Sequence, residues 1–114
     1  MKFAFTGRKM EVSDAMKEYT RKKLSKLDRF FQNDAEAQVT YRTERGRDTV
    51  EVTVKSANMY FRAQETANDV YAAIDSIVDL IERQIRKNKT RLEKRLRSGA
   101  FEQSVAASWV EPEE

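Results

Sequence analysis

The sequence of 114 residues is 36% charged and 39% hydrophobic, which is enough for one domain with a modest core. It contains no cysteine and no histidine, so disulfides, thiolate nucleophiles, zinc sites built from these residues and histidine-based triads are excluded. No apolar run is long enough to span a membrane, and the N-terminus lacks the apolar segment of a signal peptide. We therefore expect a cytoplasmic protein.

The net charge of +3 hides an uneven distribution along the chain. Residues 17–29 hold six basic and two acidic side chains, and residues 82–97 hold eight basic and two acidic ones. Residues 30–81 hold five basic against nine acidic side chains, and residues 98–114 hold four glutamates and no basic residue. Two basic segments with an acidic one between them indicate a surface that binds a polyanion, although charged helix faces are often simply solvated.

The N-terminal part of the chain predicts a strand and a helix. Apolar and polar residues alternate over residues 1–6, which is typical of a half-buried strand, and Gly7 is expected to end it. Ser13 is suited to cap the helix that follows. Apolar residues then recur at helical spacing, so we predict a helix over about 13–31.

Three strands are predicted next, around residues 37–42, 50–55 and 59–64. Polar turns at 44–48 and 56–58 join them, and such short connections favour an antiparallel meander.

A long second helix is predicted over about 67–97. Thr66 and Asp69 have the spacing of a capping box, and an aliphatic stripe begins at Val70. At about 1.5 Å per residue this helix is longer than a four-stranded sheet is wide. We therefore expect its basic C-terminal half to project beyond the packed body.

The element order β-α-β-β-β-α predicts an α+β two-layer sandwich, in which two helices cover one face of a four-stranded sheet. The first helix then acts as a crossover, so the first two strands are able to pair in parallel. We interpret residues 1–98 as one domain and residues 99–114 as a flexible linker or tail.

The basic segments supply the candidate binding residues. If the helices lie side by side, their outer faces form one basic surface whose cations meet successive phosphates. The residues that face away from the predicted core, or flank it, are Lys22, Arg29, Arg83, Arg86, Lys87, Lys89 and Arg91. Tyr71 lies beside this surface and is the best candidate for stacking on a base, whereas Tyr41 is expected in the core and Tyr60 is expected to be exposed.

Several carboxylates share the second helix, among them Asp69, Asp75, Asp79 and Glu82. Paired acids are able to transfer protons or bind a metal, but helix capping and solubility explain them better here. The sequence also lacks a glycine-rich phosphate loop and the common hydrolase motifs. We therefore expect no enzymatic activity, no cofactor and no metal site.

Two stretches of the sequence form recognisable motifs, one over segments 6–8, 12–19 and 22–31 and the other over segments 69–75 and 80–89. The second of them begins Asp-Val-Tyr-Ala-Ala-Ile-Asp at Asp69. Together they resemble the bacterial ribosome hibernation promoting factors, which are also called ribosome-associated translation inhibitors. The similarity extends over residues 1 to about 97.

The resemblance implies a fold similar to a double-stranded-RNA-binding domain with an added first strand. It also implies binding to the 16S rRNA of the small ribosomal subunit and to the 70S ribosome, in the channel used by mRNA and by tRNA at the A and P sites. The expected result is inhibition of translation in resting or stressed cells. The RNA contacts of the family map onto Arg8, Lys22, Arg83, Arg86, Lys87 and Lys89.

Long members of this family carry a C-terminal dimerisation domain that pairs two 70S ribosomes into a 100S particle. The sequence stops in a linker-like stretch at Glu114, so we interpret it as the N-terminal domain of a long member. Homodimerisation is then expected only through the domain that is missing. The alternative is a short member with an acidic tail, a type that tends to block ribosome dimers.

Two further functions stay open on the residues alone. One is a protein–protein module that modulates a transcription factor, and the other is a general double-stranded-RNA-binding domain.

Overall fold

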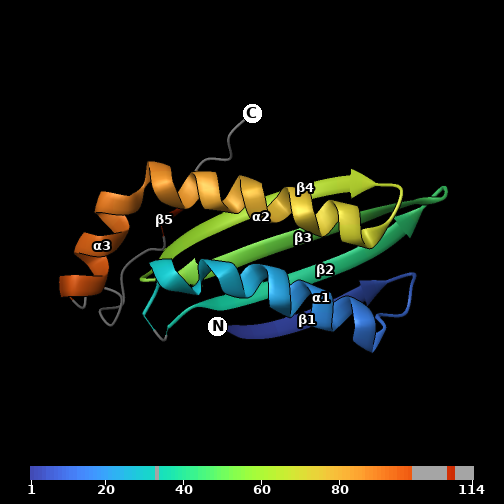
Figure 1. The fold of residues 1–114 in the computed structure, drawn as a ribbon, viewed down its shortest axis with the longest axis horizontal. Coiled ribbons are helices and arrows are strands. Elements are labelled where there is room, and N and C mark those ends of the chain that lie inside the picture. The colour runs from blue at the N-terminus through green and yellow to red at the C-terminus, as the bar shows by residue number, and fades with distance from the viewer. Residues whose placement is uncertain (33, 99–107, 110–114) are drawn as a thin grey trace.

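The computed structural model describes residues 1–32, 34–98 and 108–109, and it shows helices covering one face of a sheet (Figure 1). The predicted α+β two-layer sandwich is confirmed. In chain order the elements are β1 (Lys2–Arg8), α1 (Asp14–Leu24), the 3₁₀ helix η1 (Ser25–Phe30), β2 (Glu36–Glu44), β3 (Arg47–Ser56), β4 (Met59–Ala67), α2 (Val70–Lys87), α3 (Lys89–Ser98) and β5 (Ser108–Trp109).

The strands lie in the order β1-β2-β3-β4-β5. β1 and β2 are parallel, as the crossover through α1 predicts, and β2, β3 and β4 form the antiparallel meander. Both meander turns have two central residues with positive φ, Arg45–Gly46 and Ala57–Asn58, which is the pattern of tight hairpin turns.

The two-residue strand β5 adds to the outer edge of the predicted four-stranded sheet. Ser108 and Trp109 pair in parallel with Met59 and Tyr60 of β4. These two residues belong to the predicted linker or tail, and the rest of segment 99–114 lies outside the described residues.

Gly7 lies inside β1 and does not end the strand, contrary to the expectation from sequence. A side chain at this position would collide with the carbonyl oxygen of Met10 and come within 2.9 Å of Val12 Cγ2. Glycine therefore allows the loop after β1 to fold back closely over the strand.

The core lies between the sheet and the helices, and it contains residues from both layers. Tyr41 belongs to it, as predicted. The Tyr41 hydroxyl lies 2.6 Å from Thr20 Oγ1, and Thr20 donates its own proton to the Met16 carbonyl at 2.8 Å. The fully buried residues at the centre include Val39, Tyr41, Val50, Val52, Val54, Phe61, Ile74, Ile77 and Ile81.

The structure confirms the cap predicted for the first helix and corrects the one predicted for the second. Ser13 accepts a hydrogen bond from the Met16 amide at 3.1 Å. Thr66, in contrast, remains in β4, where its hydroxyl lies 2.7 Å from that of Thr49. Asp69 caps α2 instead, because its carboxylate accepts from the Ala72 amide at 2.8 Å. The predicted first helix is also divided, since Ser25–Phe30 form the 3₁₀ helix η1.

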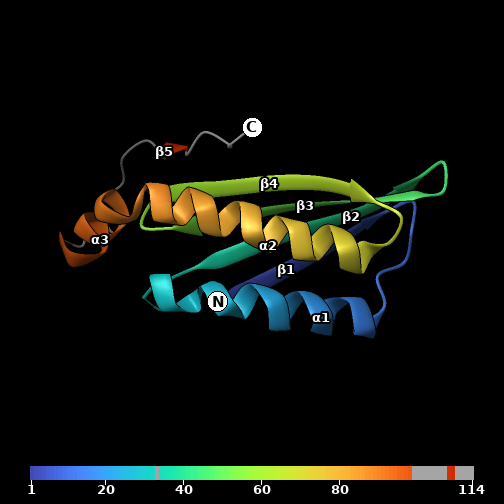
Figure 2. The same ribbon diagram turned by 45° about the horizontal axis from the view of Figure 1, so that its top comes forward.

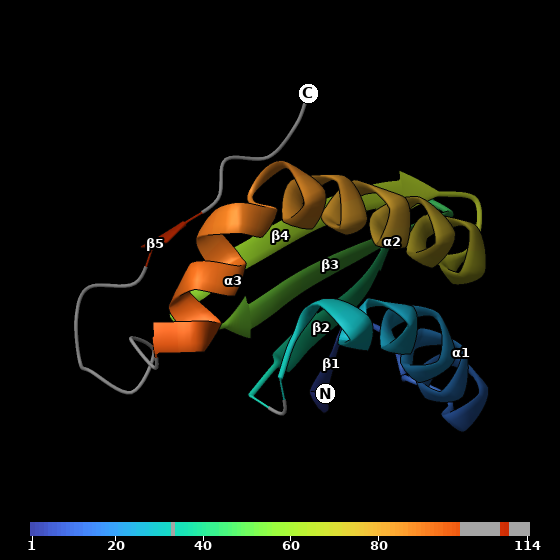
Figure 3. The same cartoon turned by 60° about the vertical axis from the view of Figure 1, so that its left-hand side comes forward.

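The long helix predicted over about 67–97 is instead two helices, α2 and α3, with a bend at Asn88 between them. The Asn88 side chain donates to the Gln84 carbonyl at 2.9 Å. Leu92 is then buried, and Arg95 Nη1 donates to the carbonyls of Ala57 and Asn58, both at 3.3 Å. The basic C-terminal part therefore extends past the end of the sheet, as expected, but it turns at Asn88 and packs beside the β3–β4 turn (Figures 1 and 3).

Gln84 joins α2 to the edge of the sheet. Gln84 is only 2% exposed, and its side-chain amide forms two hydrogen bonds with the backbone of Arg62 in β4. Nε2 donates to the Arg62 carbonyl at 2.7 Å, and Oε1 accepts from the Arg62 amide at 3.1 Å. This side chain satisfies the outward backbone groups of an edge strand, which otherwise need another strand or water.

Replacing Tyr41 by Phe is expected to change how stability depends on pH. Burial raises the pKa of Tyr41 above the usual tyrosine value. Its ionisation therefore favours the unfolded chain, and the free energy of unfolding falls above pH ~10 by up to about 1.4 kcal/mol per pH unit. The measurement is urea unfolding of both proteins between pH 8 and 11. At pH 8 the wild type should be more stable than the variant by about 1 kcal/mol, because only the wild type has the hydrogen bond to Thr20. Above pH ~10 the wild type should lose this advantage. A difference that is constant with pH would contradict this account.

Candidate nucleic-acid interface

The two basic segments lie side by side on the helical face of the molecule. Figures 1 and 2 show α1, and the segment η1 that continues it, lying alongside α2 on the same face of the sheet. Two ion pairs join the first basic segment to α2, Lys23 Nζ to Asp75 Oδ1 at 3.8 Å and Arg29 Nη2 to Glu82 Oε1 at 3.2 Å, and the second of them reaches the other basic segment. The two helices therefore lie side by side, which the sequence analysis had taken as a condition for one basic surface.

The line along which α1 and η1 meet α2 is called the α1–α2 seam below. At the end of this seam nearest the C-terminus of α2, two arginines contact one carboxylate and one aromatic ring. Glu82 accepts from Arg29 Nη2 through Oε1 and from Arg86 Nε through Oε2, both at 3.2 Å. The same two guanidiniums lie near the ring of Phe30, with Cζ at 4.8 Å from its centroid for Arg29 and 5.3 Å for Arg86. The cluster holds two cations and one anion, so it keeps a net positive charge.

Further toward the N-terminus of α2, the seam is formed by tyrosines and Asp75. Tyr19 donates its hydroxyl proton to Asp75 Oδ1 at 2.6 Å, and this hydrogen bond is the main reason why the pKa of Tyr19 is raised. Tyr71 meets Tyr19 edge to face, with ring centroids 4.9 Å apart. Tyr71 is 39% exposed, so part of its ring is available to a ligand while the rest is packed against α1.

The other predicted binding residues are distributed along the same face and around the bend. Lys22 of α1 and Arg83 and Lys87 of α2 are exposed. Lys89 and Arg91 are exposed on α3, where Lys89 Nζ lies 3.7 Å from Glu93 Oε1. The bend at Asn88 therefore turns the last basic residues toward the end of the sheet.

Arg8 lies apart from the other predicted binding residues. It ends β1 at the opposite end of the sheet from α3 (Figure 1). There it lines a small hollow of about 220 Å³ together with Lys9, Arg42, Thr43 and Glu44. The structure thus separates Arg8 from the residues of α1 and α2 with which it was grouped.

Sequence reasoning assigned Asp75 and Glu82 to helix capping or solubility and did not single out Phe30, so it missed the roles of these residues in organising the surface. The four-residue spacing of Glu82 and Arg86 on one helix is a recognisable signal for an ion pair. The contact of Glu82 with Arg29 has no such signal, because the two residues are 53 positions apart.

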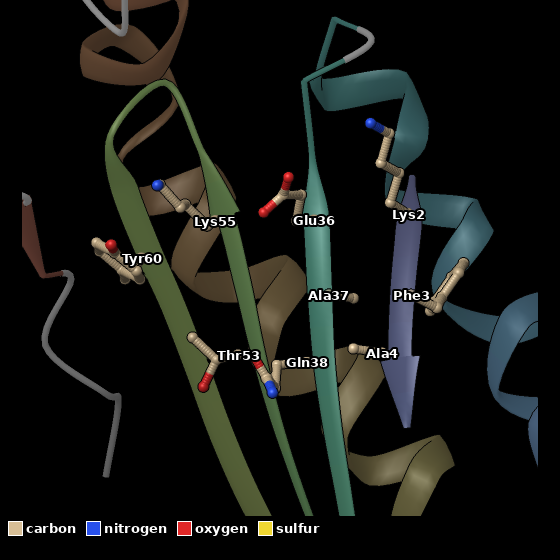
Figure 4. A pocket seen from close by; sticks show the side chains of 9 residues that line it. All are labelled: Lys2, Phe3, Ala4, Glu36, Ala37, Gln38, Thr53, Lys55 and Tyr60. Carbon is tan, nitrogen blue, oxygen red and sulfur yellow. The ribbon is translucent and has the colours of Figure 1, made fainter. Parts of the chain in front are cut away.

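The open face of the sheet carries a different feature, a hollow of about 470 Å³ (Figure 4). Lys2, Glu36 and Lys55 come from neighbouring strands, and Tyr60 points to this face as predicted but is half-buried. Lys55 Nζ lies 5.8 Å from the centroid of the Tyr60 ring. Two amines and one carboxylate contact solvent here.

Within residues 1–32, 34–98 and 108–109, no three carboxylates are grouped so that they could hold a metal ion. Over the same part of the chain, no helix is both long and apolar enough to cross a membrane.

The family model described as "Sigma 54 modulation protein / S30EA ribosomal protein" matches residues 3–93. The chain belongs to this family. Among curated S30EA relatives, a ribosome hibernation promotion factor of Lactococcus lactis subsp. cremoris (strain MG1363) is 40% identical over 103 residues, covering 86% of this chain and 55% of the relative. The ribosome hibernation promotion factor of Staphylococcus aureus (strain COL) is 34% identical over 117 residues, covering 100% of this chain and 62% of the relative. The chain thus spans little more than half the length of these S30EA relatives.

Solved structures agree with the S30EA assignment. The N-terminal domain of Thermus thermophilus Protein Y superposes with a TM-score of 0.71 at 33% identity, covering 76% of this chain and 98% of that domain. A ribosomal subunit interface protein from Coxiella burnetii has a TM-score of 0.60 at 23% identity, covering 82% of this chain and 96% of that one. The second likeness is one of fold. The resemblance inferred from the sequence is therefore confirmed at the level of the family.

Replacing Leu92 by Ala is expected to detach α3 and so move the basic residues of that helix. Leu92 is 1% exposed, and removing such a buried side chain typically costs about 2–5 kcal/mol. Amide hydrogen exchange should become faster in Lys89–Ser98 and change much less in α1. Unchanged exchange in α3 would show that the burial of Leu92 does not hold the bend.

Proposed function

We propose that this chain is a ribosome-binding domain that inhibits translation without catalysis. In this proposal its basic surface, formed by Lys22, Arg29, Arg83, Arg86, Lys87, Lys89 and Arg91, binds 16S rRNA of the small subunit in the cytoplasm. The bound domain then occupies the channel that mRNA and tRNA require at the A and P sites. Residues 1–98 supply this activity, and any pairing of 70S ribosomes into 100S particles depends on parts of the longer relatives that this chain does not span.

The observation that carries the proposal is the joining of two basic segments across the α1–α2 seam. The guanidiniums are accessible there, since the side chains of Arg29 and Arg86 are 57% and 55% exposed. Closely spaced cations on one face attract a polyanion, and each phosphate that they neutralise releases a counterion. The names of the relatives, hibernation promotion factor and subunit interface protein, support the ribosome as the source of that polyanion.

The mechanism requires occupancy and no chemical step. Folded rRNA presents phosphates at fixed positions, so a rigid pair of helices is able to match several of them at once. Because the helices are fixed to the sheet through the core, binding of their outer faces also places the bulk of the sheet in the channel.

Reversing three charges on α2 tests the proposed surface. The triple variant Arg83→Glu, Arg86→Glu, Lys87→Glu should weaken binding to purified small subunits on the order of 100-fold at moderate salt, because three phosphate contacts become repulsive. The plot of log affinity against log salt should also become less steep, its slope decreasing in magnitude by about three. Co-sedimentation with subunits across a salt series measures both quantities.

The matched control reverses three lysines that lie away from the α1–α2 seam, in the variant Lys2→Glu, Lys9→Glu, Lys55→Glu. It changes the net charge equally, and we expect near wild-type binding. An equal loss in both variants would mean that total charge, and not this surface, drives association. Equally tight binding to free RNA duplexes would favour a general double-stranded-RNA binder, and binding that does not depend on salt would favour a protein contact.

A further inference from the structure

We propose that Arg29 and Arg86 together form one binding site for a phosphodiester group, and that Glu82 is a positioning residue that holds both arginines over Phe30. The inference rests on the proposed function of the basic surface. It goes further, because it assigns a favourable role in RNA binding to a carboxylate that charge alone would count as unfavourable.

The geometry of Glu82 is that of a bridge between two helical segments. One carboxylate oxygen accepts from Arg29 of η1 and the other accepts from Arg86 of α2, each at 3.2 Å. An arginine has five N–H donors, so each guanidinium retains donors that Glu82 does not use. The two remaining sets of donors are therefore held close together by a common partner.

The depth of the three side chains decides which of them a ligand meets first. Glu82 is 32% exposed, whereas Arg29 is 57% and Arg86 is 55% exposed. The carboxylate is therefore the most buried member of the cluster, and the guanidiniums lie toward solvent. An approaching anion therefore contacts the guanidiniums, whose attraction outweighs the repulsion from the single, deeper carboxylate.

Phe30 supplies the second constraint on the arginines. Both guanidinium carbons lie within 6 Å of its ring centroid, at 4.8 and 5.3 Å, which is the range of cation–π attraction. Two like charges held this close repel each other, and without the carboxylate between them they would separate into many rotamers. Glu82 and Phe30 thus fix in advance an arrangement that RNA would otherwise have to order on binding.

The class of ligand follows from this arrangement. Two guanidiniums suit a group with two non-bridging oxygens, and guanidinium forks bind phosphate oxygens with charge-assisted hydrogen bonds. The cluster already contains one carboxylate for its two cations, so one further negative charge neutralises it. Exposed cations continue along the same helices at Lys22 and Arg83, which fits a chain of repeating phosphates better than an isolated anion.

The test is the sign of the effect of Glu82→Gln. The substitution raises the net charge by one, so simple attraction predicts tighter binding to small subunits. A positioning role predicts weaker binding, by about 5- to 10-fold at moderate salt, because the amide accepts through one oxygen only. The matched control is Asp79→Asn on the same helix. Asp79 is exposed and makes no ion pair within the described residues, so this variant should bind as wild type does or slightly more tightly.

Each outcome is decisive. Weaker binding of Glu82→Gln with an unchanged Tm, and no loss for Asp79→Asn, supports the assignment. Binding by Glu82→Gln that is equal to or tighter than that of Asp79→Asn overturns it. Failure of the wild type itself to bind subunits refutes the proposed function and is recognised before any variant is compared.

Two additional measurements keep the test independent of folding and of ligand class. If Glu82→Gln lowers Tm, the double variant Arg29→Lys, Arg86→Lys replaces it, because it keeps both charges and removes the planar forks. Loss of binding supports the two-arginine site, and unchanged binding overturns it. Competition by a short poly-glutamate peptide as strong as that by an oligoribonucleotide of equal charge overturns the assignment to phosphate.

Discussion

Burial of the aliphatic stripe of α2 against the meander is the interaction on which the rest of the molecule depends. Ile74, Ile77 and Ile81 are fully inaccessible, and the helix that carries them packs against β3 and β4. Once these side chains are inside, the basic residues of the same helix must point to solvent or toward α1. The apolar core therefore determines the position of the charges, although it contributes no charge of its own.

The acidic residues of α2 have structural roles that their number alone does not reveal. Asp69 caps the helix, Asp75 binds Tyr19 and Lys23, and Glu82 joins Arg29 to Arg86. Exposed ion pairs of this kind add little stability individually. Their effect is geometric, because each one restricts side chains that belong to the proposed binding surface.

The edges of the structure show how side chains replace missing secondary structure. Gln84 satisfies the backbone of Arg62 at the edge of β4, and Arg95 satisfies the carbonyls of the Ala57–Asn58 turn. Both side chains come from the two helices that flank the bend at Asn88. The bend is therefore fixed by polar contacts on both of its sides as well as by the burial of Leu92.

The sequence by itself determined the order of the first four strands and of the two main helical segments, the two-layer architecture and the burial of Tyr41, and it allowed the parallel pairing of β1 with β2. These features follow from the apolar periodicity within each element and from the lengths of the connections between elements, both of which can be read directly from the sequence. It also identified the basic segments and, through two motifs, the family. Only the tertiary structure decided that Asp69 and not Thr66 caps α2, that the last helix bends at Asn88, and that Arg8 lies apart. It alone paired Arg29 with Glu82, because contacts between residues 53 positions apart depend on how the helices pack, and no local pattern encodes that packing.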